Sequence, residues 1–194
     1  MNNSVMIKSE AEIELMRESG KLLAQVFAAL DTFVKPGVST MEINDFVEKY
    51  IVEELQARPA SKGQYDYQYV LNSSINEVVC HGIPKTTEIL KPKDIINLDI
   101  TLEKSGFITD SSKMYVMPEA SKKAIKLVKK TYQAMWEGIK QVKPGAKLGD
   151  VAVPFNVLQN PMATAWYAST VGMALDERCT KSRKCCTTVN QTEA

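Results

Sequence analysis

Apolar residues recur every three or four positions in the first part of the chain, which is the spacing of amphipathic helices. A Ser-x-x-Glu capping box at Ser9–Glu12 precedes one apolar series, from Ile13 to Leu30. A second capping box at Ser39–Glu42 precedes another series, from Ile43 to Leu55. The pattern therefore predicts two helices, joined by a Pro-Gly turn at Val34–Val38.

The apolar period shortens toward that of β-strands between Tyr69 and Met117. Strands are expected, between Gly, Pro, Lys and Ser residues, at about 68–73, 77–80, 94–102 and 107–117. Residues 121–141 return to helical spacing and predict a third helix. After this helix, Val142–Gly145 repeats the Val-Lys-Pro-Gly sequence of Val34–Gly37, which suggests a fold of two related halves.

Composition is that of a soluble globular protein. The 194 residues are 44% hydrophobic, and 24 Lys and Arg nearly balance 23 Asp and Glu. We therefore expect no nucleic-acid partner and, without a long apolar run, no membrane partner. The N-terminus lacks the apolar region of a secretory signal, so we expect a cytoplasmic protein whose four cysteines are free thiols.

Two aspartates in the strand region are candidate metal ligands. Asp99 lies among branched aliphatic residues, where an unpaired charge is costly. If a hairpin turn is centred between Lys104 and Ser105, Asp99 and Asp110 face each other. Like charges roughly 4.5–5.5 Å apart need a counter-charge, and their oxygens suit divalent cations. The alternatives are an exposed hairpin with two unrelated aspartates, or a three-residue loop that places them on opposite faces.

His81 is the single histidine of the chain. Its neighbour Cys80 is not expected to form a catalytic dyad with it, because adjacent strand residues point to opposite faces. We interpret His81 as an imidazole at a strand end, placed by the turn at Gly82 and Pro84. The alternative is an ordinary turn histidine.

Three runs of residues resemble type I methionine aminopeptidases. They are Asn76–Pro84 (NEVVCHGIP), Ile96–Thr101 (INLDIT) and Thr109–Met114 (TDSSKM). The resemblance extends from about Ile7 to Asp150. It implies an α+β fold of the pseudo-two-fold pitta-bread type, of which this chain holds the N-terminal half and an incomplete C-terminal half.

The resemblance also implies a function and a site. Family members use divalent metal ions, two per intact site and of the Co, Mn, Fe or Zn kind, to remove the initiator methionine from nascent polypeptides. By resemblance, Asp99 and Asp110 are metal ligands and His81 contacts the substrate. An intact member is expected to be a monomer.

The resemblance ends near residue 150. The family's remaining ligands, one histidine and two glutamates, lie beyond that point, where this chain has no histidine and only Glu177 and Glu193. Codons compatible with Met162–Lys181, read one base out of frame, encode GYSVVREYCGHGIGREMHE, which resembles the family's next segment. We therefore expect a family domain over 1–150, a frame-shifted and poorly ordered tail over 151–194, and no activity. The alternative is a non-catalytic binding protein that keeps the fold.

Overall fold

The computed structural model describes residues 7–147, 149–152 and 185–187. The chain divides into two compact units, one of residues 1–118 with 176–194 and the other of residues 119–175. The second unit contains helix α3 (Lys122–Ile139), where the sequence predicts a helix. No helix within the described ranges is long and apolar enough to cross a membrane.

Helices α1 (Glu10–Phe33) and α2 (Thr40–Lys49) form where the sequence predicts them. Both begin with the predicted capping box, in which the serine hydroxyl accepts a hydrogen bond from the glutamate backbone amide, at 3.3 Å in α1 and 3.2 Å in α2. A π-helical turn at Tyr50–Glu54 continues α2. Helix α1 runs to Phe33 rather than Leu30, because neither proline nor glycine follows Leu30 directly.

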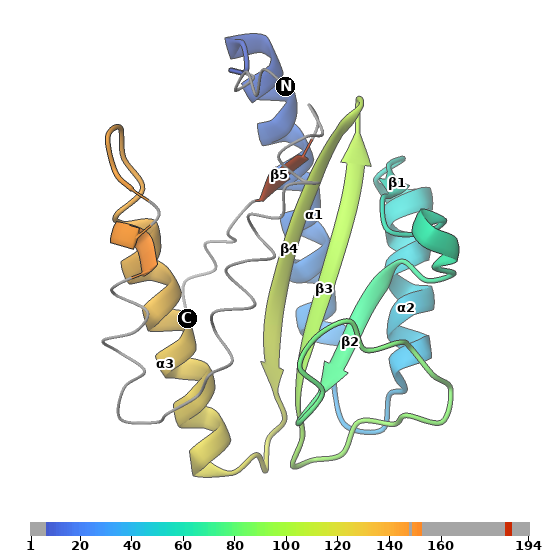
Figure 1. Cartoon of the computed structure of the whole chain (residues 1–194). Coiled ribbons are helices and arrows are strands. Elements are labelled where there is room, and N and C mark those ends of the chain that lie inside the picture. Colours follow the sequence, from blue (N-terminus) through green and yellow to red (C-terminus); the bar gives the residue numbers. More distant parts are fainter. Residues whose placement is uncertain (1–6, 148, 153–184, 188–194) are drawn as a thin grey trace. The chain divides into compact units, whose positions relative to one another are not determined.

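Strand β3 (Ile95–Lys104) pairs with antiparallel neighbours on both of its sides within a five-stranded sheet (Figure 1). On one side it pairs along its whole length with β4 (Phe107–Val116). On the other side it pairs with β2 (Leu71–Ile75) and, further along, with the short β1 (Arg58–Pro59). The short β5 (Cys185–Thr187) lies parallel to β4. The two longest predicted strands, which became β3 and β4, are confirmed.

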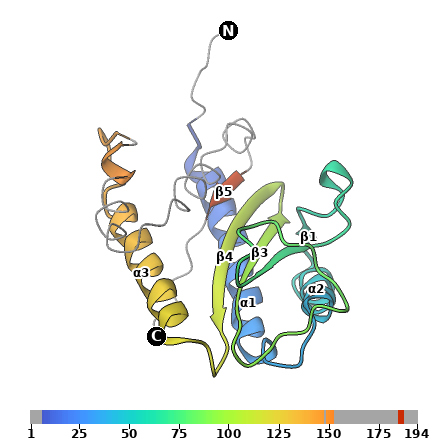
Figure 2. The same cartoon turned by 60° about the horizontal axis from the view of Figure 1, so that its bottom comes forward.

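The strand predicted at 68–73 forms slightly later, as β2, and the one predicted at 77–80 is wrong. Residues 77–80 belong to the long irregular loop between β2 and β3, which is green in Figure 2. The chain turns directly after β2, where the amide of Val78 donates to the carbonyl of Ile75 at 3.0 Å. The apolar side chains of this segment are exposed, 52% in the case of Val79, so its pattern does not report a buried strand.

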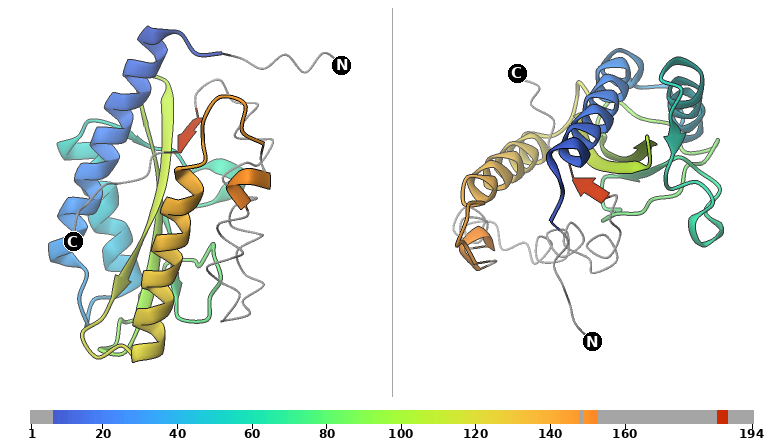
Figure 3. Two further views of the ribbon diagram at one scale, coloured as in Figure 1. Left: turned by 90° about the vertical axis from the view of Figure 1, so that its left-hand side faces the viewer. Right: turned by 90° about the horizontal axis from the view of Figure 1, so that it is seen from above.

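The hydrophobic core of the first unit lies between helices α1 and α2 and one face of β3. The even-numbered residues of β3 from Ile96 to Leu102 are fully buried. They pack with Leu23, Phe27 and Leu30 of α1 and with residues of α2. Figure 3 shows α1 and α2 side by side over the sheet. Because side chains alternate along a strand, the opposite face of β3 carries its odd-numbered polar residues: Asn97, Asp99, Thr101 and Glu103.

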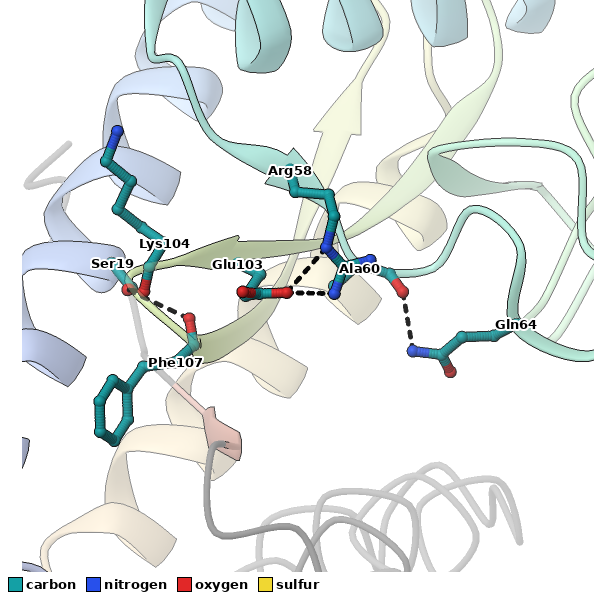
Figure 4. A network of polar contacts seen from close by, with 7 residues as sticks. All are labelled: Ser19, Arg58, Ala60, Gln64, Glu103, Lys104 and Phe107. Atoms are coloured by element: carbon teal, nitrogen blue, oxygen red, sulfur yellow. Dashed lines mark hydrogen bonds and ion pairs between the residues drawn. The ribbon is translucent and has the colours of Figure 1, made fainter.

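The turn between β3 and β4 is anchored to helix α1 by a buried serine (Figure 4). The hydroxyl of Ser19 lies 3.3 Å from the carbonyl oxygen of Lys104 and 3.2 Å from that of Phe107, the two residues that flank the turn. The turn residues themselves, Ser105 and Gly106, have φ values of +53° and +82°. Two consecutive positive φ values are typical of a type I′ turn, whose twist matches that of the strands.

The repeated Val-Lys-Pro-Gly sequence forms the same turn twice, after α1 and after α3. In both copies the glycine has a positive φ, +93° and +84°, and the residue after it donates its amide to the lysine carbonyl, at 3.3 and 3.0 Å. Each turn leads into a helix start where a carboxylate accepts a backbone amide at 2.8 Å, Glu42 Oε2 in the first copy and Asp150 Oδ2 in the second. The local geometry therefore agrees with two related halves.

The loop between β2 and β3 approaches β2 closely at Gly82. The amide of Ser73 donates to the carbonyl of Gly82 at 2.8 Å, and a Cβ on Gly82 would lie 1.9 Å from the Ser73 carbonyl oxygen. We expect Gly82→Ala to lower the free energy of unfolding by at least about 2 kcal/mol, as overpacking of this severity does. Urea denaturation measures the change.

The matched control is Gly149→Ala, since a Cβ at Gly149 meets nothing within 4 Å. This control should leave the free energy of unfolding unchanged or slightly raised, because alanine favours a helix over glycine. Equal stabilities of Gly82→Ala and the unaltered chain would contradict the close approach.

Candidate metal centre

Strands β3 and β4 place Asp99 and Asp110, hereafter the aspartate pair, on one face of the sheet. Asp99 lies opposite Ser112, and Asp110 lies opposite Thr101. The expected direct pairing of the two aspartates is therefore wrong. The turn is centred one residue later than expected, which shifts every partner by two positions. Since the side-chain period of a strand is also two, the aspartates stay on the same face as diagonal neighbours.

The two carboxyl groups of the aspartate pair are hydrogen-bonded to each other. Burial, the nearby charge of Asp99 and the hydrogen bond with Asp99 together raise the pKa of Asp110 to about 8. Burial also raises the pKa of Asp99, although hydrogen bonds from Asn72 and Asp110 and the nearby His81 act in the opposite direction. An ionised carboxylate only accepts hydrogen bonds, so this contact requires a proton on one of the two carboxyl groups.

Asn72 of β2 also contacts the aspartate pair, and the sequence reasoning did not find it. It lies opposite Asp99, and its Nδ2 donates to Asp99 Oδ2 at 3.3 Å. Tyr67 is close as well: burial raises its pKa to about 12, helped by Tyr69 and by the charge of Asp99. No local motif marks either neighbour, and the pairing of β2 with β3 is what places Asn72 beside Asp99.

His81 lies in the loop between β2 and β3, so the expected position at a strand end is wrong. Its backbone has a positive φ of +55°, a conformation that is unusual outside glycine. The side chain is exposed, yet it is close enough to lower the pKa of Asp99 electrostatically. The next residue, Gly82, holds the loop backbone against β2 through the hydrogen bond from the Ser73 amide.

Glu103 is the next acidic residue on the same face of β3, but it has another partner. Arg58 of β1 lies opposite it and donates Nε to Glu103 Oε2 at 2.7 Å, as the dashed lines in Figure 4 show. This ion pair joins the edge strand β1 to β3. Glu103 is therefore a structural residue rather than a third neighbour of the aspartate pair.

The aspartate pair fits a divalent cation. Two carboxylates on one face offer the hard oxygen ligands that such ions prefer. A cation between them would reduce their mutual repulsion, as a shared proton does. The buried hydroxyl of Thr101, opposite Asp110, has no hydrogen-bond partner among the described residues. Within those residues, no three His, Cys, Asp or Glu side chains gather into a metal-binding group. The described residues therefore offer two candidate carboxylate ligands, Asp99 and Asp110.

The arrangement of helices and strands is that of a known class of metallopeptidases. Residues 14–158 match metallopeptidase family M24, and the chain belongs to this family. The solved structures that it resembles include the crystal structure of a methionine aminopeptidase from Rickettsia prowazekii, with a TM-score of 0.78 and 36% identity over 81% of this chain and 63% of that chain. A prolidase from Pyrococcus horikoshii, 15% identical with a TM-score of 0.71 over 84% of this chain and 45% of that chain, shares the fold. The predicted pitta-bread fold is confirmed.

Curated relatives narrow the resemblance to methionine aminopeptidases. The chain is 39% identical over 148 residues to the methionine aminopeptidase of Escherichia coli, covering 76% of this chain and 56% of the relative. It is 38% identical over 156 residues to methionine aminopeptidase B of Synechocystis sp., covering 78% and 57%. The predicted family resemblance is therefore confirmed, and the chain spans somewhat more than half the length of these relatives.

The aspartate pair makes stability depend on pH. The pKa of Asp110 is raised from 3.8 to about 8 in the folded chain, so between these values the folded state binds more protons than the unfolded state. The free energy of unfolding should therefore fall as the pH rises from about 4 to about 8, by up to about 1.4 kcal/mol per pH unit. Urea denaturation at a series of pH values measures this slope.

Asp110→Asn should remove most of the slope, because the amide cannot lose a proton in this range. Asp66→Asn is the control, since Asp66 is exposed. The interpretation of a shared proton is wrong if the slope survives in Asp110→Asn.

Proposed function

We propose that this chain contributes the N-terminal half of a metal-dependent methionine aminopeptidase, which removes the initiator methionine from nascent polypeptides in the cytoplasm. The observation that carries the proposal is the buried aspartate pair on β3 and β4, in a chain about 39% identical to methionine aminopeptidases. Paired carboxylates at this depth are costly without a cation, and a metallopeptidase supplies one.

In this proposal each site residue has a separate role. Asp99 and Asp110 hold one or two divalent ions of the Co, Mn, Fe or Zn kind, which when bound polarise the carbonyl of the scissile amide and activate water. His81, exposed on its loop beside Asp99, contacts the substrate. Asn72 holds the carboxylate of Asp99 in place through its amide.

We further propose that this chain by itself does not catalyse the reaction. The resemblance requires one histidine and two glutamates beyond the aspartate pair, and the only histidine of the sequence is His81. A reading-frame change near residue 151 accounts for their loss, with residues 1–150 as the family domain and 151–194 as an unrelated tail. The nucleotide sequence around codons 150–156 tests this directly. Apart from 151–152 and 185–187, the tail lies outside the described residues.

Cation binding is the first test of the proposal. We expect the chain to bind Mn²⁺ or Co²⁺ weakly, because the aspartate pair lacks the other ligands of a complete site. Asp99→Asn should raise the Kd for the cation at least about tenfold. It removes a group that contacts the cation directly, and even the loss of a group that contacts only a ligand has an effect of about this size. Isothermal titration calorimetry measures both, with Asp66→Asn as the control, and equal affinities of Asp99→Asn and the unaltered chain would refute the metal site.

Methionine release is the second test. With Mn²⁺ or Co²⁺ present, we expect no measurable release of methionine from a Met-Ala-Ser peptide, because the coordination shell and proton transfer need the additional ligands. Restoring the reading frame by one base near codon 151 should recover release. Turnover by the unaltered chain at the rate of an intact family member would contradict the proposed inactivity. Failure of the restored chain to release methionine, although it folds, would favour a binding protein instead.

A further inference from the structure

The side-chain hydroxyl of Thr101, beside the aspartate pair, has no part in the roles proposed so far. It is buried and has no hydrogen-bond partner among the described residues. A buried hydroxyl without a partner costs free energy, so such groups are rare in native proteins and call for an explanation. The only other buried side-chain group in this condition within the described ranges is Ser73 Oγ, on the opposite, core-facing side of the sheet.

The position of Thr101 in the sheet restricts what its hydroxyl can reach. Thr101 lies opposite Asp110 on β4, and on its other side Ala60 donates its amide to the Thr101 carbonyl at 3.1 Å. Ala60 is fully buried and offers no polar side-chain atom. Along β3, Thr101 lies between Asp99 and Glu103 on the same face. Because Glu103 is paired with Arg58, the carboxyl groups of the aspartate pair are the acceptors this hydroxyl faces.

We propose that Thr101 is a positioning residue of the metal centre, whose hydroxyl donates to the carboxylate of Asp110 when a divalent cation is bound. A carboxylate that binds a cation keeps lone pairs free for a hydrogen-bond donor. Outer-shell donors of this kind orient metal-binding carboxylates, and their loss typically weakens metal affinity 10- to 100-fold. This inference rests on the proposed function, since it requires the aspartate pair to bind a cation.

Two substitutions at Thr101 separate the hydroxyl from the shape of the side chain. Thr101→Val keeps the branched shape and removes the hydroxyl, whereas Thr101→Ser keeps the hydroxyl and loses a methyl group. Mn²⁺ titration by calorimetry should show a Kd about tenfold higher for Thr101→Val and within about threefold of the unaltered value for Thr101→Ser. Thr109→Val is the matched control, because Thr109 is buried on the core-facing side of β4 and should not affect Mn²⁺ affinity.

The thermal midpoint without metal supplies an independent readout. If the hydroxyl has no partner in the metal-free chain, Thr101→Val should leave the midpoint unchanged or raise it, because an unsatisfied buried polar group is removed. A lowered midpoint would show that the hydroxyl has a structural partner and would overturn the proposal. A Kd for Thr101→Val equal to that of the unaltered chain, or an equal loss in Thr101→Ser, would also overturn it.

These outcomes distinguish the failure of this inference from the failure of the proposed function. If the unaltered chain binds Mn²⁺ and Asp99→Asn does not, but Thr101→Val binds as tightly as the unaltered chain, only the role of Thr101 is refuted. If the unaltered chain does not bind Mn²⁺ at all, the metal site and the role of Thr101 fail together.

Discussion

The register of the β3–β4 hairpin is the constraint on which the candidate metal centre depends. A two-residue turn at Ser105 and Gly106, with both φ values positive, joins the strands, and Ser19 of α1 contacts both ends of that turn. A slip by one residue would turn one aspartate away from the other and expose apolar residues of the core face. By setting the register, this turn therefore determines which residues of β3 and β4 face the core and places Asp99 and Asp110 on the same face of the sheet.

The aspartate pair links stability to binding. Two buried carboxyl groups in contact need a proton or a cation between them, and burial raises the pKa of both, which favours a retained proton. A bound cation must displace this proton, so metal affinity should rise with pH while the stability of the metal-free chain falls. Two buried carboxyl groups that repel each other when ionised are unfavourable for stability, and an unfavourable arrangement of this kind is typical of a functional site.

The loop that carries His81 is held at both ends and at its closest approach to the sheet. At the two ends, Nδ2 of Asn76 donates to Oδ1 of Asp94 at 2.8 Å, and the amide of Ile95 donates to Oδ1 of Asn76 at 3.1 Å. Between them, Gly82 lies against the backbone of β2. These contacts oppose the conformational cost of the positive φ at His81. They hold the backbone of the loop that carries the exposed His81.

Elements with local signals could be predicted from the order of residues alone. The capping boxes at Ser9 and Ser39 predict helix starts, because a hydroxyl and a carboxylate three residues apart satisfy backbone amides in any context. The alternation along β3 predicts which of its faces is buried. The repeated Val-Lys-Pro-Gly turn is likewise local, and both copies adopt the same conformation. The NEVVCHGIP and INLDIT runs identified the family for the same reason, since they needed no three-dimensional information.

The way in which these elements meet depends on contacts between distant parts of the folded chain. The pairing of Asp99 with Ser112, rather than with Asp110, depends on which two residues form the turn, and the contact with Ser19 comes from a distant helix. The neighbour Asn72 has no local motif, and it lies beside Asp99 because β2 and β3, which a long loop separates in the sequence, pair with each other. Burial, which raises the pKa of the aspartate pair, is likewise a property of the whole packed unit, because it depends on what surrounds the two carboxyl groups rather than on the residues beside them in the chain.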